Sequence, residues 1–205
     1  MSAIFGILNL DGSPVNPEIM KKMVISLKHR GPDGSDFIIN GEIGIGHQMF
    51  HITPESLTEK LPYQCNHFII TGDIRLDNRN ELFELLEIEN CEKTIPDSLL
   101  VLKAYKKWGQ NFVDHLLGDY SIAIWDKLKK VLVLVTDHMG IRPIFYCKTE
   151  KHFIFATEIK GIFATDLIAK CLNKSFLATN IVLPTAMIVL PEETFFENIF
   201  AMTTA

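Results

Sequence analysis

Two neighbouring stretches in the second half of the chain, residues 120–125 and 131–135, are apolar at nearly every position and place the strongest constraint on the fold. A strand with apolar side chains on both faces must be covered on both faces. Residues 126–130 are polar and are typical of a hairpin loop between two strands. Residues 144–147 and 153–156 predict two more strands, with helical patterns before and after the group. We therefore expect stacked sheets covered on the outside by helices.

The chain begins with another strongly apolar stretch. Residues 3–10 end at the turn-forming pair Asp11-Gly12 and predict a buried strand. Because chain ends usually fray, an end that starts inside the core needs a reason. Once Met1 is removed, Ser2 would combine a hydroxyl nucleophile with its own α-amine, a general base of pKa about 8. The alternative is a strand that is simply first in the chain.

Helical patterns occupy much of the remaining first half. Pro17 opens a helix with an apolar face, and Pro96 opens another that ends at Gly109. The apolar face of the first helix consists of Met20, Met23, Val24 and Leu27. Asp77 is the predicted N-cap of a short helix between them. Three further strands are predicted at residues 37–40, 42–49 and 67–71.

Charge and hydropathy exclude several functional classes. The net charge of -5 is mild and no run of Lys and Arg occurs, so nucleic acid is a poor candidate partner. No apolar run approaches the roughly 20 residues of a membrane helix, and the first residues do not resemble a signal peptide. The sequence therefore predicts a cytoplasmic protein without a membrane partner.

Metal and disulfide sites are not expected either. His47 and His51 are four residues apart, a metal-binding spacing on a helix, but this segment has a strand and loop pattern and no third ligand is nearby. We therefore predict no metal site. The four cysteines are widely separated and are expected to be buried free thiols: Cys65, Cys91, Cys147 and Cys171.

A series of short motifs extends along the whole chain. In order they are Ile4-Phe5-Gly6-Ile7, His29-Arg30-Gly31-Pro32-Asp33-Gly34, Gly46-His47, Thr71-Gly72-Asp73, Leu117-Gly118-Asp119-Tyr120 with Trp125-Asp126, Asp137-His138-Met139-Gly140-Ile141-Arg142-Pro143, and Ala156-Thr157-Glu158-Ile159-Lys160. With these motifs the chain resembles the N-terminal glutaminase domain of glutamine-hydrolysing asparagine synthetases. That domain is a class II glutamine amidotransferase with the N-terminal nucleophile fold. The resemblance implies an α+β fold, a four-layer αββα sandwich of two antiparallel sheets.

The resemblance also assigns the reacting groups. In that family a terminal cysteine attacks the side-chain amide of glutamine, its α-amine moves the proton, and an Asn-Gly pair forms the oxyanion hole. Here Ser2 matches the nucleophile, and its hydroxyl is far less ionised than a thiol. Thr71 and Gly72 match the Asn-Gly pair, so the Gly72 N–H is kept and an amide donor is lost. Such a loss costs on the order of 3 kcal/mol in a comparable site.

The groups that hold the substrate are only partly kept. Met49 matches an arginine that grips the substrate carboxylate, and a thioether cannot replace a bidentate guanidinium. Asp73 and Asp97 match two carboxylates that bind the substrate α-amine. The alternative is that Asp73 is a turn residue and Asp97 a carboxylate in the first turn of a helix.

These departures predict a domain that binds or hydrolyses glutamine weakly or not at all and serves as the structural half of an amide-forming enzyme. Residues 1–165 would form the amidotransferase-like domain, and residues 166–205 a tail or linker towards a synthetase domain absent from this sequence. No cofactor is expected in this domain. ATP and Mg²⁺ are expected only in the synthetase domain, because this chain has no Ser-Gly-Gly-x-Asp loop.

Two alternatives remain open at this stage. One is an active hydrolase that uses Ser2 on glutamine or another amide, and the other is a free-standing interaction domain. The partners compatible with the sequence are a synthetase domain in the same or another chain, weakly bound glutamine, and a second copy of the chain in a homodimer.

Overall fold

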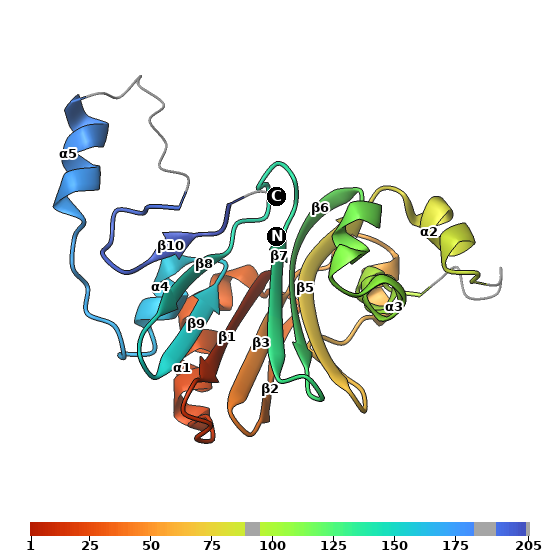
Figure 1. Ribbon diagram of the computed structural model, residues 1–205, viewed down its shortest axis with the longest axis horizontal. Helices are drawn as coiled ribbons and strands as arrows, with labels where there is room; N and C mark the ends of the chain where they lie inside the picture. The colour runs from red at the N-terminus through yellow and green to blue at the C-terminus, as the bar shows by residue number, and fades with distance from the viewer. Residues whose placement is uncertain (89–94, 183–191, 204–205) are drawn as a thin grey trace.

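Two antiparallel sheets form the centre of the molecule (Figure 1). The computed structural model describes residues 1–88, 95–182 and 192–203. The first sheet has the order β10-β8-β9-β1-β3-β2 and the second the order β4-β5-β6-β7. The first sheet contains β1 (Ala3–Asn9), β2 (Gly34–Asn40), β3 (Ile43–Met49), β8 (Phe145–Lys148), β9 (His152–Ala156) and β10 (Phe200–Ala201). The second contains β4 (Tyr63–Gln64), β5 (Phe68–Leu76), β6 (Gly118–Asp126) and β7 (Val131–Thr136).

Helices cover the outer face of each sheet, so the predicted α+β sandwich is confirmed (Figure 1). α1 (Pro17–Leu27) and α4 (Ile159–Phe163) pack on the first sheet, while α2 (Arg79–Leu85) and α3 (Asp97–Trp108) pack on the second. A third apolar cluster joins the sheets face to face. Its side chains include Ile4, Ile45, Ile69, Trp125 and Phe155.

The first strand of the sequence lies inside the first sheet, as the apolar pattern of residues 3–10 predicts. β1 pairs with β3 on one side and with β9 on the other. Ala3 lies opposite Gln48 and Phe5 lies opposite Ala156. The start of the chain is therefore fixed between two neighbours and faces the second sheet.

The ends of the helices follow from local side chains. Asn16 caps α1 by accepting a hydrogen bond from the Glu18 N–H at 3.0 Å, and Pro17 occupies the first turn. Gly109 ends α3 with a φ of 60°, a conformation that favours glycine. The prediction for α2 was wrong by one residue, because Asn78 and not Asp77 occupies the N-cap position. Short 3₁₀ helices are Lys28–Arg30, Glu55–Thr58 and Gly109–His115.

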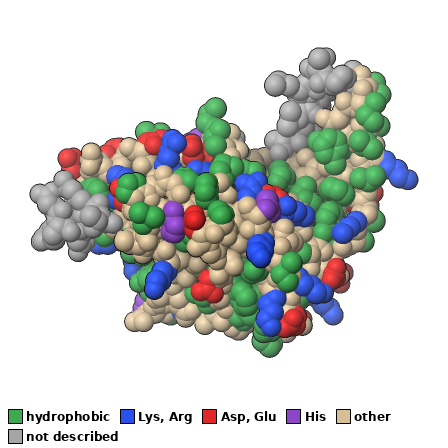
Figure 2. Space-filling model, turned by 180° about the vertical axis from the view of Figure 1, so that it is seen from behind, with side chains coloured by type: hydrophobic (Ala, Val, Ile, Leu, Met, Phe, Trp, Pro, Cys, Tyr) green, Lys and Arg blue, Asp and Glu red, His purple; other side chains and the backbone are tan. Residues whose placement is uncertain are grey.

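The segment expected to be a tail has two different parts. α5 (Lys174–Val182) lies away from the sheets and has no buried residue (Figure 1). Exposed apolar side chains gather over α5, with Ile181 and Val182 among them (Figure 2). β10, by contrast, returns to the first sheet and pairs with β8. The boundary at residue 165 stays a prediction, although the last described residues complete a sheet of the domain.

The cysteines are buried to different degrees. Cys147 is buried, as predicted, but Cys65 is half-buried and Cys171 is exposed, so the prediction was wrong for these two. Cys171 lies shortly before α5, a helix that also has no buried residue. Cys91 lies outside the described residues. Among the helices that the structure describes, none combines the length and hydrophobicity that crossing a bilayer requires.

Candidate active site

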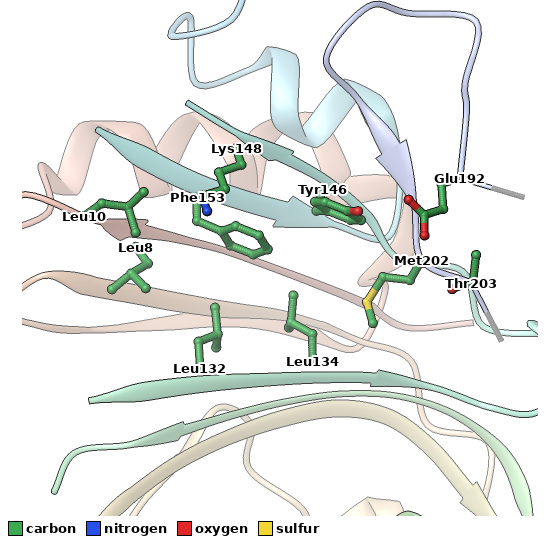
Figure 3. A pocket seen from close by; sticks show the side chains of 10 residues that line it. All are labelled: Leu8, Leu10, Leu132, Leu134, Tyr146, Lys148, Phe153, Glu192, Met202 and Thr203. Atoms are coloured by element: carbon green, nitrogen blue, oxygen red, sulfur yellow. The ribbon is translucent and has the colours of Figure 1, made fainter. Parts of the chain in front are cut away.

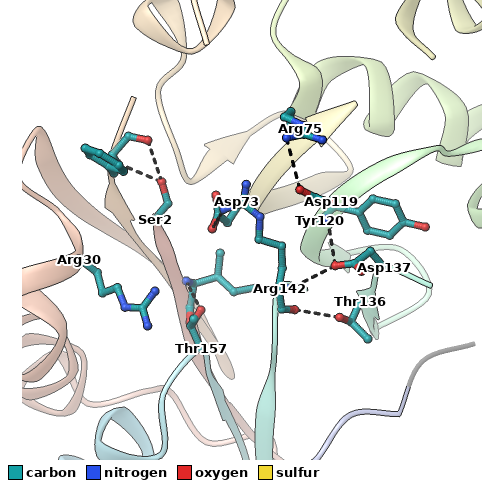
Figure 4. A network of polar contacts seen from close by, with 12 residues as sticks. Ser2, Arg30, Asp73, Arg75, Asp119, Tyr120, Thr136, Asp137, Arg142 and Thr157 are labelled. Atoms are coloured by element: carbon teal, nitrogen blue, oxygen red, sulfur yellow. Dashed lines mark hydrogen bonds and ion pairs between the residues drawn. The ribbon is translucent and has the colours of Figure 1, made fainter. Parts of the chain in front are cut away.

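Ser2 precedes β1 at one end of the space between the sheets. Its side chain forms hydrogen bonds with the backbone of Phe50. Its Oγ accepts a hydrogen bond from the Phe50 N–H at 3.0 Å and lies 3.2 Å from the Phe50 carbonyl oxygen, to which it donates (Figure 4). Nearby, Thr157 fixes the first strand, because its Oγ1 accepts from the Ile4 N–H at 2.9 Å. Ser2 is only 4% exposed. Ser2, the predicted nucleophile, is therefore buried, and its hydroxyl is engaged both as donor and as acceptor.

Thr71 and Gly72 lie inside β5, opposite Ala123 and Ile122 of β6. Thr71 is fully buried, and its Oγ1 lies 3.0 Å from Nδ1 of His47 on β3. Burial lowers the pKa of His47 to about 3, with a smaller effect from His51, so the ring is neutral at pH 7. The Thr71 hydroxyl thus joins the two sheets.

Gly72 allows close packing within its own sheet. A Cβ at this position would lie 2.5 Å from the Ile74 side chain. The predicted strand 67–71 extends to Leu76, so Asp73 lies within a strand. The alternative interpretation of Asp73 as a turn residue is therefore wrong.

Asp73 forms a buried ion pair that the sequence does not reveal. Its Oδ2 lies 2.5 Å from Nη1 of Arg142, and both side chains are 5% exposed (Figure 4). Burial raises the pKa of Asp73, against the lowering effects of the charge and hydrogen bond of Arg142. Arg30 and the α-amino group act on Asp73 in the same lowering direction. This end of the space between the sheets therefore holds a buried carboxylate paired with a buried guanidinium.

Arg142 is held by the loop that follows β7. The Asp137 carboxylate accepts hydrogen bonds from the backbone N–H groups of Ile141 and Arg142, each at 3.0 Å, and of Met139 at 3.1 Å. Burial would raise the pKa of Asp137, but these hydrogen bonds lower it below its usual value. Thr136 donates to the Arg142 carbonyl oxygen at 2.8 Å. The backbone that carries the guanidinium is therefore well fixed.

Asp97 is the first residue of α3 and is also paired. Its Oδ2 accepts from the Leu76 N–H at 3.0 Å, and its Oδ1 contacts Nη1 of Arg79. Burial raises the pKa of Asp97, while the Leu76 hydrogen bond and the Arg79 charge lower it. Met49, the third predicted substrate contact, ends β3 opposite Gly34 and is partly buried.

Several participants at this site escape the sequence analysis. The sequence names Arg142 and His47 only as members of motifs, His47 also as a discounted metal ligand, and it gives Arg79 no role. One sequence signal could have indicated Arg142 as a site residue: the Asp137 to Arg142 motif is polar and directly follows an apolar strand. Among the described residues, no group of three or more His, Cys, Asp and Glu side chains could hold a metal ion.

A separate cleft opens between the sheets near the other end of β1 (Figure 3). It has a volume of about 430 Å³, and its lining includes Leu8, Leu132, Tyr146 and Phe153. None of the predicted site residues lines it. The site end and the cleft are therefore two distinct environments within one inter-sheet space.

The two facing antiparallel sheets, covered on the outside by helices, form an arrangement that solved structures share. A solved structure of glutamine phosphoribosylpyrophosphate amidotransferase from B. subtilis has a TM-score of 0.62 with this chain at 19% identity. The match covers 80% of this chain and 43% of that one. A second solved structure, an allosteric regulatory enzyme of purine biosynthesis, has a TM-score of 0.59 at 18% identity, with the same coverage.

Sequence comparison gives the family. The glutamine amidotransferase domain family matches residues 1–205, and the chain belongs to it. The chain is 32% identical over 170 residues to asparagine synthetase [glutamine-hydrolyzing] 2 of Bacillus subtilis, covering 80% of this chain and 22% of that protein. It is 33% identical over 188 residues to a putative asparagine synthetase [glutamine-hydrolyzing] 2 of Methanocaldococcus jannaschii, covering 83% and 36%. The chain thus spans between 22% and 36% of the length of these relatives.

Proposed function

We propose that this domain is the glutaminase-type half of an ATP-dependent, amide-forming enzyme, that its glutamine hydrolysis is lost or strongly weakened, and that its main role is structural. The observation that carries the proposal is Ser2. Its hydroxyl is buried and engaged in both directions with the backbone of Phe50. A serine nucleophile needs a base that takes its proton, and here the proton is directed to a carbonyl oxygen.

The oxyanion position supports the same conclusion. Thr71 replaces a side-chain amide, and its hydroxyl contacts a neutral, buried His47 rather than pointing freely to a reacting carbonyl. Losing one oxyanion donor lowers kcat by roughly 100- to 1,000-fold in a comparable enzyme. A weaker nucleophile adds to that loss, because a hydroxyl is scarcely ionised at neutral pH.

The rest of the proposed enzyme lies outside this domain. Most of the length of the asparagine synthetase relatives is not matched by this chain. We propose that a synthetase domain, in the same or another chain, supplies the ATP and Mg²⁺ chemistry, and that the cytoplasm is the compartment. A homodimer is compatible with this assignment.

A glutaminase assay tests the proposal. Purified protein is incubated with L-glutamine and glutamate is measured, with the Ser2→Ala variant as background and Ser26→Ala as a matched control in α1. The glutamine-hydrolysing asparagine synthetase 2 of Bacillus subtilis is the positive control. We expect the three forms of this chain to release glutamate at the same background rate.

The contrary result is glutamate release that disappears in Ser2→Ala and persists in Ser26→Ala. That result would favour an active N-terminal serine hydrolase. An intact-mass measurement gives the complementary test, since a working Ser2 needs a free α-amine and therefore the loss of Met1.

A further inference from the structure

The two sheets cover each other incompletely along one side. The first sheet has six strands and the second has four. β1 packs against β5 and β6, so β7 lies across from β9 and β8, and the first sheet continues past it through β10. Leu132 and Leu134 of β7 point between the sheets but are only half-buried. Among the described residues, no strand therefore covers the inner face of the first sheet beside β7.

The cleft of about 430 Å³ opens onto this uncovered strip (Figure 3). Tyr146 and Phe153 form one wall, with their rings stacked at a centroid distance of 5.7 Å. Leu132 faces these rings from the other sheet. Lys148 and Glu192 lie towards opposite ends of the cleft, and neither side chain has an ion-pair partner among the described residues. The cleft thus combines an apolar centre with one free charge of each sign.

β7 is an edge strand whose free backbone groups can be assigned. Among the described strands it pairs with β6 only. The Asp137 N–H, just past its end, donates to the Tyr120 carbonyl oxygen of β6 at 2.9 Å. Because successive residues of a strand point their backbone groups to opposite sides, the N–H and C=O groups of Leu134 and Leu132 face away from β6. Unpaired donors and acceptors of this kind are a template for a further strand.

The space beside β7 favours one strand over a larger occupant. An extended peptide on a sheet edge gains main-chain hydrogen bonds, and its alternate side chains enter the space beneath it. A second copy of this chain does not fit there. An antiparallel pair of β7 strands across a two-fold axis would bring the projecting β8 and β10 of both copies into the same space.

We propose that β7 and the cleft form a binding site for one extended peptide segment of another polypeptide, which adds to the second sheet antiparallel to β7. Because β7 runs from the Lys148 end of the cleft to the Glu192 end, the added strand begins near Glu192 and ends near Lys148 (Figure 3). Its inward side chains are basic at the start, apolar in the centre and acidic at the end. This site is separate from Ser2 and does not depend on the proposed loss of glutaminase activity.

Peptide binding to the wild-type protein tests the proposal. The probe is the heptapeptide Lys-Thr-Val-Thr-Leu-Thr-Glu, acetylated and amidated at its ends, whose Lys, Val, Leu and Glu side chains share one face. We expect saturable binding in calorimetry with a Kd below about 1 mM. Hydrogen exchange of the Leu134 N–H should slow in the complex, whereas the Val133 N–H, which already faces β6, should not change.

N-methylation of the peptide provides the matched controls. Residues directly opposite each other in an antiparallel pair share a face, so the Val and Leu amides of the probe meet β7 and its Thr amides point away. Methylating the Val and Leu nitrogens should weaken binding about tenfold or more, because two hydrogen bonds are lost. Methylating the last two Thr nitrogens should have little effect.

Two pairs of variants locate the site. Leu134→Thr should weaken binding of the unmodified probe about fivefold or more, whereas Val133→Thr, on the other face of β7, should not. Lys148→Gln should weaken it about two- to fivefold at low salt. Lys151→Gln, in the turn between β8 and β9 and outside the cleft lining, should leave it unchanged.

Three results would overturn the proposal. The first is the absence of saturable binding of the unmodified probe to the wild type. The second is equal weakening by both methylation patterns, because apolar adsorption then explains the binding. The third is slowed exchange of the Leu134 N–H on raising the protein concentration without peptide, which would assign the edge to a second copy of the chain.

Discussion

Asp73 and Glu158 both meet basic side chains near the start of β1, but in different surroundings. Asp73 lies between the sheets and is 5% exposed. Glu158 precedes α4 and is 22% exposed, and it accepts from His29 at 3.0 Å, from Lys160 at 2.9 Å and from Arg30. Burial raises the pKa of Asp73. Partial burial would also raise the pKa of Glu158, but hydrogen bonds from its basic partners lower it to about 2.

The difference shows that the number of partners and the access of water decide whether the pKa of a carboxyl is raised or lowered. Glu158 gains three partners and keeps contact with solvent, so the charged form is favoured at little cost. Asp73 gains the single contact with Arg142 and loses its water, and one partner does not fully offset the desolvation of a charge. The buried pair therefore matters most when one partner is removed.

The largest expected effect comes from breaking the buried pair. Arg142→Met should lower the free energy of unfolding by about 3–5 kcal/mol, because it leaves the Asp73 carboxylate buried without its cation. Glu158→Gln should lower it by about 1 kcal/mol or less, since water screens that cluster. Urea denaturation at pH 7 measures both changes.

The double variant Asp73→Asn/Arg142→Met sharpens this contrast. It removes both charges together, so we expect it to recover most of the stability lost in Arg142→Met. If single and double variants are equally unstable, lost packing rather than an unpaired charge causes the change, and the contrast between the two carboxylates disappears.

The second effect is the pH dependence of stability. The folded-state pKa of Glu158 is about 2, below its ordinary value of 4.5, so its contribution is present above pH 4.5 and is lost as the pH falls towards 2. The pKa of Asp73 is raised, so its unfavourable contribution is instead relieved as the pH falls through that pKa towards 3.8.

The matched measurement is urea denaturation of the wild type and of Glu158→Gln between pH 6 and pH 2. The stability difference between them should shrink on acidification, by on the order of 1 kcal/mol after solvent screening. A difference that stays constant over this range would show that the charge of Glu158 does not stabilise the fold.

The strands of this fold could be predicted because burial on both faces leaves a local pattern. Residues 120–125 and 131–135 fall within β6 and β7, and residues 3–10 correspond closely to β1. The layer order followed from the positions of the helices around these strands. Each of these inferences depends on neighbours in sequence, which is where hydrophobic periodicity carries information.

The partners of the site residues could not be predicted in this way. Asp73 and Arg142 are 69 residues apart and come into contact only in the folded chain. The motif that contains Arg142 was recognised, but a motif does not give the direction of a side chain. The sequence around Asp73 is compatible with a turn as well as with a strand, because no local signal marks that β5 continues to Leu76.

The smallest expected effect concerns Ser121, which lies opposite Asp73 in the pairing of β5 with β6. Ser121 is 1% exposed, and its Oγ has no hydrogen-bond partner among the described residues. Ser121→Ala removes an unpaired hydroxyl, so the free energy of unfolding should change by less than about 1 kcal/mol. Thr136→Val is the matched control and should cost about 1 kcal/mol, because it removes the hydrogen bond to the Arg142 carbonyl oxygen. A larger loss in Ser121→Ala than in Thr136→Val would mean that the hydroxyl supports the Asp73 carboxylate, and the buried carboxylate would then have more than one partner.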